Sequence, residues 1–319
     1  DFYYLYTSKI IFFTHASPFE KNIRRKDQLI INLWHGCGYK DVGTEKKAGP
    51  HLFDYALVPG PIFLETKSKF WNCQLKQIIP EGYPRYDLLS EFSKQAQDYL
   101  SNNKNNRNDK CIIWMPTFRA TSNKKRLESF IQIRKGYDLP LVEKEENLFV
   151  LNQFCSDHNI TIIIKRHYAQ NKYQSEEQQF TNIKFISNED LISNHVELYS
   201  ILQYTDALIS DYSSIAIDYL LIDKPIAFAL DDYEEYKAAR GFVFENPLDY
   251  MPGHHLYTFE DLKQFIKDVA EDKDYFAGDS QKLMKVMHNP CNCYCERIWD
   301  TVQNLTSNKT RSYHGGEQQ

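Results

Sequence analysis

The sequence lacks any long hydrophobic run, which argues against a membrane-spanning helix. Its longest apolar stretches, residues 160–164 and 214–222, are far shorter than the roughly 18 residues that a transmembrane helix needs. The first residues also lack the basic region followed by an apolar region that marks a secretory signal peptide. We therefore expect a cytoplasmic protein.

The sequence also lacks an excess of positive charge and a regular cysteine framework. Its net charge of −5 weakens the interpretation as a general nucleic-acid binder, although a local basic cleft remains possible. Seven cysteines, an odd number and mostly scattered, fit reduced thiols better than disulfides. The run from Cys291 to Cys295 has tighter spacing than a usual metal site and no evident fourth ligand, so we interpret it as a loop before a last helix.

What the sequence does contain is an alternation of short apolar strands and amphipathic helices. Its 319 residues suit two domains, and 14% aromatic residues allow large cores. Many of the strands lack two-residue alternation, which is typical of strands buried on both faces of a parallel sheet. The predicted strands are residues 9–13, 29–34, 55–58, 77–80, 111–115, 161–165, 183–186, 207–210 and 225–229. The predicted helices are residues 85–100, 146–158, 197–204, 214–222, 259–271 and 293–305.

An Asn-rich polar stretch at residues 101–110 reads as a linker between two domains. The first domain, residues 1–100, has few strands for a complete sheet, so we expect it to be truncated. The second, residues 111–290, could form a complete doubly wound domain, and residues 291–319 would be a C-terminal helix and tail. Because ligands of parallel sheets bind at the carboxyl ends of strands, the residues after each strand are the candidate site.

The first strand-end candidate is the segment from Trp34 to Lys40. His35 follows an apolar strand and can exchange a proton near neutral pH, while Gly36 allows a sharp turn and close approach of a ligand. A structural histidine that caps a turn is the alternative.

The second and third candidates carry groups suited to phosphate. Lys165 and His167 follow a buried strand, where cationic groups would face a ligand, although a solvated basic edge is equally compatible. Asp211, Ser213 and Ser214 lie where a strand runs directly into a helix, and the free N–H groups of a first helical turn attract anions. Simple helix capping by Ser213 is the alternative. Arg119 and Arg240 follow other predicted elements and are weaker phosphate candidates.

These segments, in order and spacing, resemble the CDP-glycerol glycerophosphotransferase family, whose members build teichoic acids and some bacterial capsules. The resemblance covers about residues 28–300 and includes six ordered motifs. They are Trp34-His35-Gly36, Gly82-Tyr83-Pro84-Arg85-Tyr86-Asp87, Pro116-Thr117-Phe118-Arg119, Lys165-Arg166-His167, Ser210-Asp211-Tyr212-Ser213-Ser214 and Arg240-Gly241-Phe242.

The resemblance implies an α/β fold of the GT-B class, with two Rossmann-like domains facing a cleft and a C-terminal helix crossing back. It implies transfer of glycerol phosphate or ribitol phosphate from a CDP-activated donor to an acceptor hydroxyl, with release of CMP. His35 would be the general base and His167 would stabilise the donor diphosphate. The other implied diphosphate ligands are Ser213, Ser214, Lys165, Arg119, Arg240 and Asp211, and the acceptor side would include Trp34, Gly36 and Lys40.

We expect no resident cofactor, because the CDP-polyol is a substrate, and the sequence shows no metal-binding motif, which the reaction does not require. The other partner would be a lipid-linked or oligosaccharide acceptor, which brings the protein to the inner membrane face, and no nucleic acid is expected. The sequence departs from the family pattern at Cys37-Gly38, at Tyr168 and at His254-His255, the last of which we interpret as a loop. Two alternatives stay open: a GT-B glycosyltransferase or epimerase that uses a nucleotide sugar, and a degenerate, non-catalytic nucleotide-binding domain.

Overall fold

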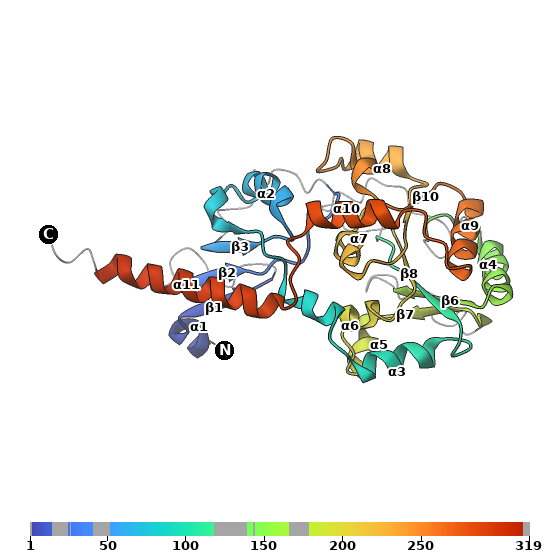
Figure 1. The fold of residues 1–319 in the computed structure, drawn as a ribbon, viewed down its shortest axis with the longest axis horizontal. Coiled ribbons are helices and arrows are strands. Elements are labelled where there is room, and N and C mark those ends of the chain that lie inside the picture. The colour runs from blue at the N-terminus through green and yellow to red at the C-terminus, as the bar shows by residue number, and fades with distance from the viewer. Residues whose placement is uncertain are drawn as a thin grey trace. The chain divides into compact units, whose positions relative to one another are not determined.

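The structure is a computed structural model in which the chain forms two compact units (Figure 1). It describes residues 2–14, 25, 27–40, 52–117, 139–142, 144–165 and 179–314. Unit 1 comprises Asp1–Cys37, Val42–Asp87 and Lys285–Gln319, and unit 2 comprises Gly38–Asp41 and Leu88–Met284. The chain therefore enters unit 2 for four residues before it completes the strands of unit 1.

Unit 1 is built on a parallel sheet with the strand order β1-β2-β3-β4. Every residue of β2 is buried, as expected for an apolar strand with neighbours on both sides. The strands are β1 (Ile10–Phe13), β2 (Leu29–Asn32), β3 (Tyr55–Leu57) and β4 (Ile78–Ile79). The helices are α1 (Phe2–Thr7), η1 (Pro61–Phe63), α2 (Leu64–Trp71), η2 (Leu75–Gln77), η3 (Pro84–Leu89), which continues into unit 2, and α11 (Tyr294–His314).

The last helix, α11, is fixed to unit 1 by the segment Gly82–Asp87. Tyr294 stacks edge-on against Tyr86, with ring centroids 5.1 Å apart. Gly82 has a φ of +81°, and a Cβ at this position would lie 2.7 Å from the Tyr294 ring, so glycine serves both the turn and the packing. The family-like motif at these residues therefore packs against the first turn of the C-terminal helix.

Unit 2 contains a parallel six-stranded sheet in the order β10-β9-β8-β5-β6-β7. The first strand along the chain, β5, lies inside the sheet, and later strands are added on both of its sides. The strands are β5 (Lys110–Trp114), β6 (Ile160–Lys165), β7 (Ile183–Ile186), β8 (Ala207–Ser210), β9 (Ile226–Ala229) and β10 (His254–Leu256).

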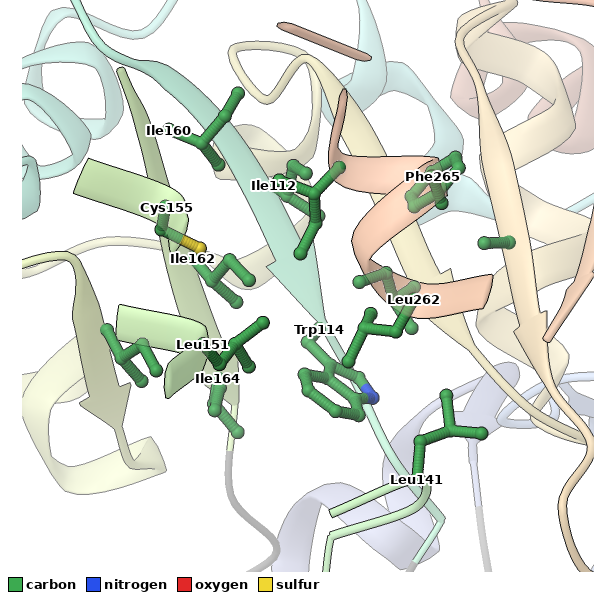
Figure 2. Packing of buried hydrophobic residues seen from close by; sticks show 14 of the residues in the cluster. Ile112, Trp114, Leu141, Leu151, Cys155, Ile160, Ile162, Ile164, Leu262 and Phe265 are labelled. Atoms are coloured by element: carbon green, nitrogen blue, oxygen red, sulfur yellow. The ribbon is translucent and has the colours of Figure 1, made fainter. Parts of the chain in front are cut away.

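Alternate residues of the central strands fill two separate cores. Ile112 and Trp114 pack in one buried cluster, to which α4 contributes Leu151 and α9 contributes Phe265 (Figure 2). Cys111, one position earlier on β5, packs in the other cluster with α3, α5 and α6. The two-residue period of a strand thus places helices on both faces of the sheet, the doubly wound arrangement that the sequence predicted.

Three helices of unit 2, α3, α5 and α9, begin at side-chain caps. Ser187 and Thr258 each accept a hydrogen bond from the third helical residue in a capping box. The helices are α3 (Lys94–Asn103), α4 (Glu145–Asp157), α5 (Asn188–Ser193), α6 (Leu198–Leu202), α7 (Ser214–Tyr219), η7 (Leu220–Ile222), α8 (Tyr233–Ala239), η8 (Pro247–Tyr250), α9 (Phe259–Ala270) and α10 (Ala277–Met287), whose end continues into unit 1.

All nine predicted strands are present, and five of the six predicted helices match α4, α6, α7 with η7, α9 and α11. The helix expected at residues 85–100 is instead η3 followed by α3, because the Ser93 side chain accepts from Ala96 N and starts a new helix there. The loop expected at His254-His255 is wrong, since both residues belong to β10.

The division of the chain differs from the expected linker at residues 101–110. Residues 101–103 end α3, and Lys110 begins β5, so this stretch lies within unit 2. The units separate after Asp87, because Ala96, Tyr99 and Leu100 of α3 pack in the core of unit 2. No helix in the described ranges is long and apolar enough to cross a membrane.

Candidate active site

The candidate site of unit 1 is the His35 loop, defined as residues 34–37, which follows β2. Trp34 has a φ of +55° and Gly36 a φ of +135°, so the backbone turns sharply on both sides of the histidine. A left-handed conformation is rare for a bulky residue such as Trp34 and marks local strain. Asn32 Oδ1 supports the turn by accepting a hydrogen bond of 2.8 Å from Trp34 N.

His35 is exposed and lies at the carboxyl ends of β1 and β2. Its Nδ1 lies 3.3 Å from the backbone carbonyl oxygen of Thr14, the residue after β1. A carbonyl can only accept, so this contact is a hydrogen bond in the tautomer that carries its proton on Nδ1, and in that tautomer the lone pair is on Nε2. A neutral imidazole at this exposed position has the chemistry of a general base.

An aromatic cluster of unit 1 supports the His35 loop and was not predicted from the sequence. The Trp34 ring lies 3.9 Å from the His35 ring and 5.3 Å from that of Trp71, centroid to centroid. The buried Lys67 of α2 lies over the rings of Trp34 and Trp71, with Nζ–centroid distances of 5.0 Å and 5.5 Å. No strand-end rule indicates Lys67, because it lies in the middle of a helix.

The candidate site of unit 2 lies at the point where the strand order reverses, between β5 and β8. The chain builds β6 and β7 on one side of β5, and β8, β9 and β10 on the other. Loops that leave two such neighbouring strands diverge, which is why this position binds ligands in open α/β sheets. Thr117 follows β5, and Asp211, Ser213 and Ser214 follow β8.

Asp211 joins these two loops. Its buried carboxylate accepts hydrogen bonds from Thr117 N at 2.7 Å and from Thr117 Oγ1 at 2.5 Å. Because both oxygens of the carboxylate are engaged, the geometry gives Asp211 the task of holding Thr117 in place.

Ser213 and Ser214 start α7. Ser213 has the extended conformation of an N-cap, but its hydroxyl makes no capping hydrogen bond, and both side chains are half-buried. The backbone of Gly38 lies against them, since a Cβ on Gly38 would be 3.0 Å from Ser214 N. The start of α7 therefore offers N–H groups and hydroxyls next to a residue that has no side chain.

Lys40 belongs to unit 2, whereas the sequence placed it with His35 on the acceptor side. It forms an antiparallel bridge with Phe242, and Val243 N donates to Tyr39 O at 2.8 Å. Residues 38–41 belong to unit 2 because the ring of Tyr39 is completely buried among aromatic rings of that unit. Arg240, half-buried at the end of α8, lies two residues before Phe242.

Lys165 ends β6 and is buried. Burial lowers the pKa of its ammonium group, while the negative charges of Glu189 and Asp190 oppose the shift. His167 and Arg119 lie outside the described residues. The candidate residues thus fall into two groups: Trp34, His35 and Gly36 in unit 1, and Lys40, Lys165, Asp211, Ser213, Ser214 and Arg240 in unit 2.

Comparisons with known proteins agree with these motifs. The chain is 28% identical over 294 residues to the teichoic acid ribitol-phosphate polymerase TarK of Staphylococcus aureus, covering 86% of this chain and 52% of TarK. It is 25% identical over 329 residues to a teichoic acid glycerol-phosphate primase of Bacillus subtilis, covering 96% of this chain and 76% of the primase. The chain therefore spans about half the length of the polymerase.

Among solved structures, a variant of the wall teichoic acid polymerase TagF superimposes with a TM-score of 0.70 and 20% identity, over 95% of this chain and 74% of that one. This likeness confirms the predicted GT-B fold class of parallel-sheet α/β units. A family model described as CDP-Glycerol:Poly(glycerophosphate) glycerophosphotransferase matches residues 1–293. The chain belongs to this CDP-glycerol glycerophosphotransferase family.

Proposed function

We propose that the chain transfers glycerol phosphate or ribitol phosphate from a CDP-activated donor to an acceptor hydroxyl on a growing teichoic-acid-like or capsular polymer. Membership of the family supports the reaction type. Similar identities to a ribitol-phosphate polymerase and a glycerol-phosphate primase leave both polyols as candidates. The observation that carries the proposal is the exposed position of His35, which follows β2 on a sharply turned loop and has its Nδ1 3.3 Å from the carbonyl oxygen of Thr14.

In the proposed step, His35 Nε2 accepts the proton of the acceptor hydroxyl as its oxygen attacks the β-phosphorus of the donor. The new bond joins the acceptor oxygen to the β-phosphorus, and the bond from that phosphorus to the bridging oxygen breaks. CMP leaves with the electron pair of the broken bond. Phosphoryl transfer depends mainly on positioning and on stabilising charge, which side chains and backbone N–H groups can supply without a resident cofactor.

On the donor side, we propose that Ser213 and Ser214 bind the diphosphate through their hydroxyls and the N–H groups that begin α7. Lys165 and Arg240 would add positive charge, as would Arg119 and His167 according to the family resemblance. Asp211 acts indirectly, because its carboxylate holds Thr117 next to the start of α7. Lys40, which the resemblance assigns to the acceptor side, pairs with Phe242 in unit 2.

On the acceptor side, Trp34 and Gly36 set the backbone that presents His35. We further propose peripheral contact with a membrane that carries a lipid-linked acceptor. Tyr3 and Tyr4 of α1 and Phe12 of β1 are exposed, at 67%, 65% and 41%, and tyrosine favours the membrane–water interface. Co-sedimentation with anionic vesicles should be lost when Tyr3 and Tyr4 are replaced by Ser, and unchanged sedimentation of this variant would oppose the membrane contact.

The deciding experiment is a CMP-release assay with CDP-glycerol, CDP-ribitol and UDP-sugars as donors and a lipid-linked oligomer as acceptor. CMP release from either CDP-polyol, dependent on the acceptor, supports the proposal. Turnover of a UDP-sugar alone would favour the glycosyltransferase or epimerase alternative. Tight CDP-polyol binding without CMP release from any acceptor would favour a degenerate binding domain.

A further inference from the structure

Lys67 is a buried cation with no acidic partner in the described part of the chain. Its side chain on α2 is only 6% exposed. The ammonium group lies over three aromatic rings, at 4.7 Å from the Phe70 centroid, 5.0 Å from that of Trp34 and 5.5 Å from that of Trp71. These ring contacts are the interactions that the structure gives this ammonium group.

Rings alone compensate a buried charge incompletely. Removing an ammonium group from water is costly unless hydrogen bonds and an opposite charge replace its hydration, and a cation–π contact supplies only part of this. A purely structural lysine at this place would be better replaced by an apolar residue. None of the described residues supplies this negative charge, so the arrangement favours a bound anion.

Two more donors in the same cluster lack an acceptor. The indole Nε1 atoms of Trp34 and Trp71 are buried and have no hydrogen-bond partner in the described structure. Trp34 is 9% exposed and Trp71 is 2% exposed. A cluster with one cation and two N–H donors, but no acceptor, has the chemistry that recognises phosphate oxygens.

The cluster is tied directly to the candidate base. Trp34 contacts both Lys67 and His35, and its left-handed backbone places the His35 ring 3.9 Å from its own ring. An anion held by Lys67 would therefore lie close to the hydroxyl that His35 deprotonates.

We propose that Lys67, with the indole N–H groups of Trp34 and Trp71, forms a subsite that binds a phosphate group of the acceptor. The inference rests on the proposed function, and it deepens that function by naming a phosphate-bearing acceptor. A diester within a polymer and a monoester both present anionic oxygens to such a subsite, and the binding experiment below distinguishes the two. Lys67 is a binding residue of the acceptor and takes no part in proton transfer.

The test compares Lys67→Met, Lys67→Arg and, as a matched control on the same helix, Lys69→Met, because Lys69 is exposed. Kinetics with a water-soluble glycerol-phosphate oligomer should show the acceptor KM raised about tenfold or more in Lys67→Met, as expected when a charged hydrogen bond is lost. The donor KM should stay within about twofold of the wild-type value. Lys67→Arg should recover most of the acceptor affinity, and Lys69→Met should match wild type.

A structural role gives a different pattern. If Lys67 only packs against the rings, Lys67→Met should leave the acceptor KM unchanged, and that result would overturn the subsite. Thermal unfolding serves as the second readout, because an apolar Met should keep or raise the unfolding temperature while acceptor affinity falls. If Lys67→Met fails to fold, the Lys67→Arg variant decides. Arg keeps the positive charge, so the proposal requires an acceptor KM close to that of wild type. An acceptor KM raised tenfold in Lys67→Arg overturns the proposal.

A binding experiment separates this inference from the reaction itself. Tryptophan fluorescence of the full chain is titrated with glycerol phosphate, with the soluble glycerol-phosphate oligomer, and with neutral glycerol. Saturable quenching by either phosphate probe, but not by glycerol, and its loss in Lys67→Met support the subsite even if no CMP is released. The stronger of the two phosphate probes tells monoester from diester. Absence of saturable quenching by both would overturn the inference, whereas quenching without CMP release would count against the proposed function alone.

Discussion

The carboxylate of Asp211 holds Thr117 by two hydrogen bonds, to its backbone nitrogen at 2.7 Å and to its hydroxyl at 2.5 Å. The two residues lie 94 positions apart in the chain, one after β8 and the other after β5. These two hydrogen bonds connect the segments that follow β5 and β8, at the point where the strand order of the unit 2 sheet reverses.

Replacing Asp211 by Asn should therefore weaken donor binding indirectly. The amide loses the charge and offers one acceptor oxygen in place of two, so one Thr117 donor stays unsatisfied, at a cost of about 1–3 kcal/mol. We expect a lower urea midpoint and a weaker Kd for CDP-glycerol in titration calorimetry. Thr117→Val, which removes the hydroxyl and keeps the backbone N–H, should show a smaller loss of both. Wild-type donor affinity in Asp211→Asn would refute the positioning role.

His35→Gln tests the proposed base. Gln keeps a polar side chain at the exposed position but cannot accept a proton near neutral pH, so kcat for CMP release should fall about 100-fold or more. Donor affinity should remain near wild type, because the proposed role of His35 is to accept the proton of the acceptor hydroxyl and not to bind the donor. A His35→Gln enzyme with normal kcat would remove the base from the mechanism.

Gly38→Ala tests the close approach of the backbone to the start of α7. The new Cβ would lie 3.0 Å from Ser214 N and 3.3 Å from Tyr212 O, so the neighbouring backbone must shift. We expect a several-fold loss of donor affinity in calorimetry. Gly278→Ala is the matched control, because nothing lies within 4 Å of a Cβ there and alanine favours a helix by about 1 kcal/mol. Equal donor affinities for the two variants would contradict the prediction.

Asp87→Ala should loosen α11. Asp87 Oδ1 accepts from Tyr294 N at 2.5 Å and Oδ2 accepts from Cys295 N at 2.9 Å, so one carboxylate caps the first turn of the helix. Loss of such a cap costs about 1–2 kcal/mol. Hydrogen exchange of the α11 amides should become faster, while Asp300→Ala, an exposed change on the same helix, should leave their exchange unaltered. Unchanged exchange in Asp87→Ala would show that other contacts hold α11.

His254 should make unit 2 less stable in mild acid. Burial lowers the pKa of His254 below 6.5, although Asp268, 4.0 Å away, and Asp274 oppose the shift. The unfolded chain then binds more protons than the folded one, so the free energy of unfolding falls as pH drops from 6.5 towards the folded-state pKa. Urea unfolding across this pH window checks the slope. His254→Gln should flatten it, and an equal slope in this variant would assign the acid sensitivity to another group.

The strands were predictable because their signal is local. An isoleucine-rich run such as β6, which is buried at every position, is typical of a strand covered on both faces of a parallel sheet. The positions of Ser213 and Ser214 were equally predictable, since a strand leads directly into α7. By contrast, β10 was missed because His254 and His255 are polar, and their place in the sheet comes from pairing with β9.

The part of the site that sequence reasoning missed depends on contacts between distant segments. Lys67 reads as an ordinary surface lysine of an amphipathic helix until Trp34 and Trp71 surround it. Lys40 reads as part of the His35 segment, and only the burial of Tyr39 in unit 2 reassigns it. Neither arrangement leaves a spacing or composition that a single sequence reveals.

The early excursion of residues 38–41 has a practical consequence for dissecting the protein into fragments. A fragment of residues 88–284 would contain the whole six-stranded sheet but not the Tyr39 ring, which contacts Phe228 and Phe244 and donates its hydroxyl hydrogen to Tyr250 O at 2.9 Å. Such a fragment would have a cavity where the Tyr39 ring is buried, and Phe242 would lose its backbone bridge to Lys40. Cutting the gene at the obvious boundary would thus yield an incomplete product, which a short synthetic peptide spanning Gly38 to Asp41 should help to repair.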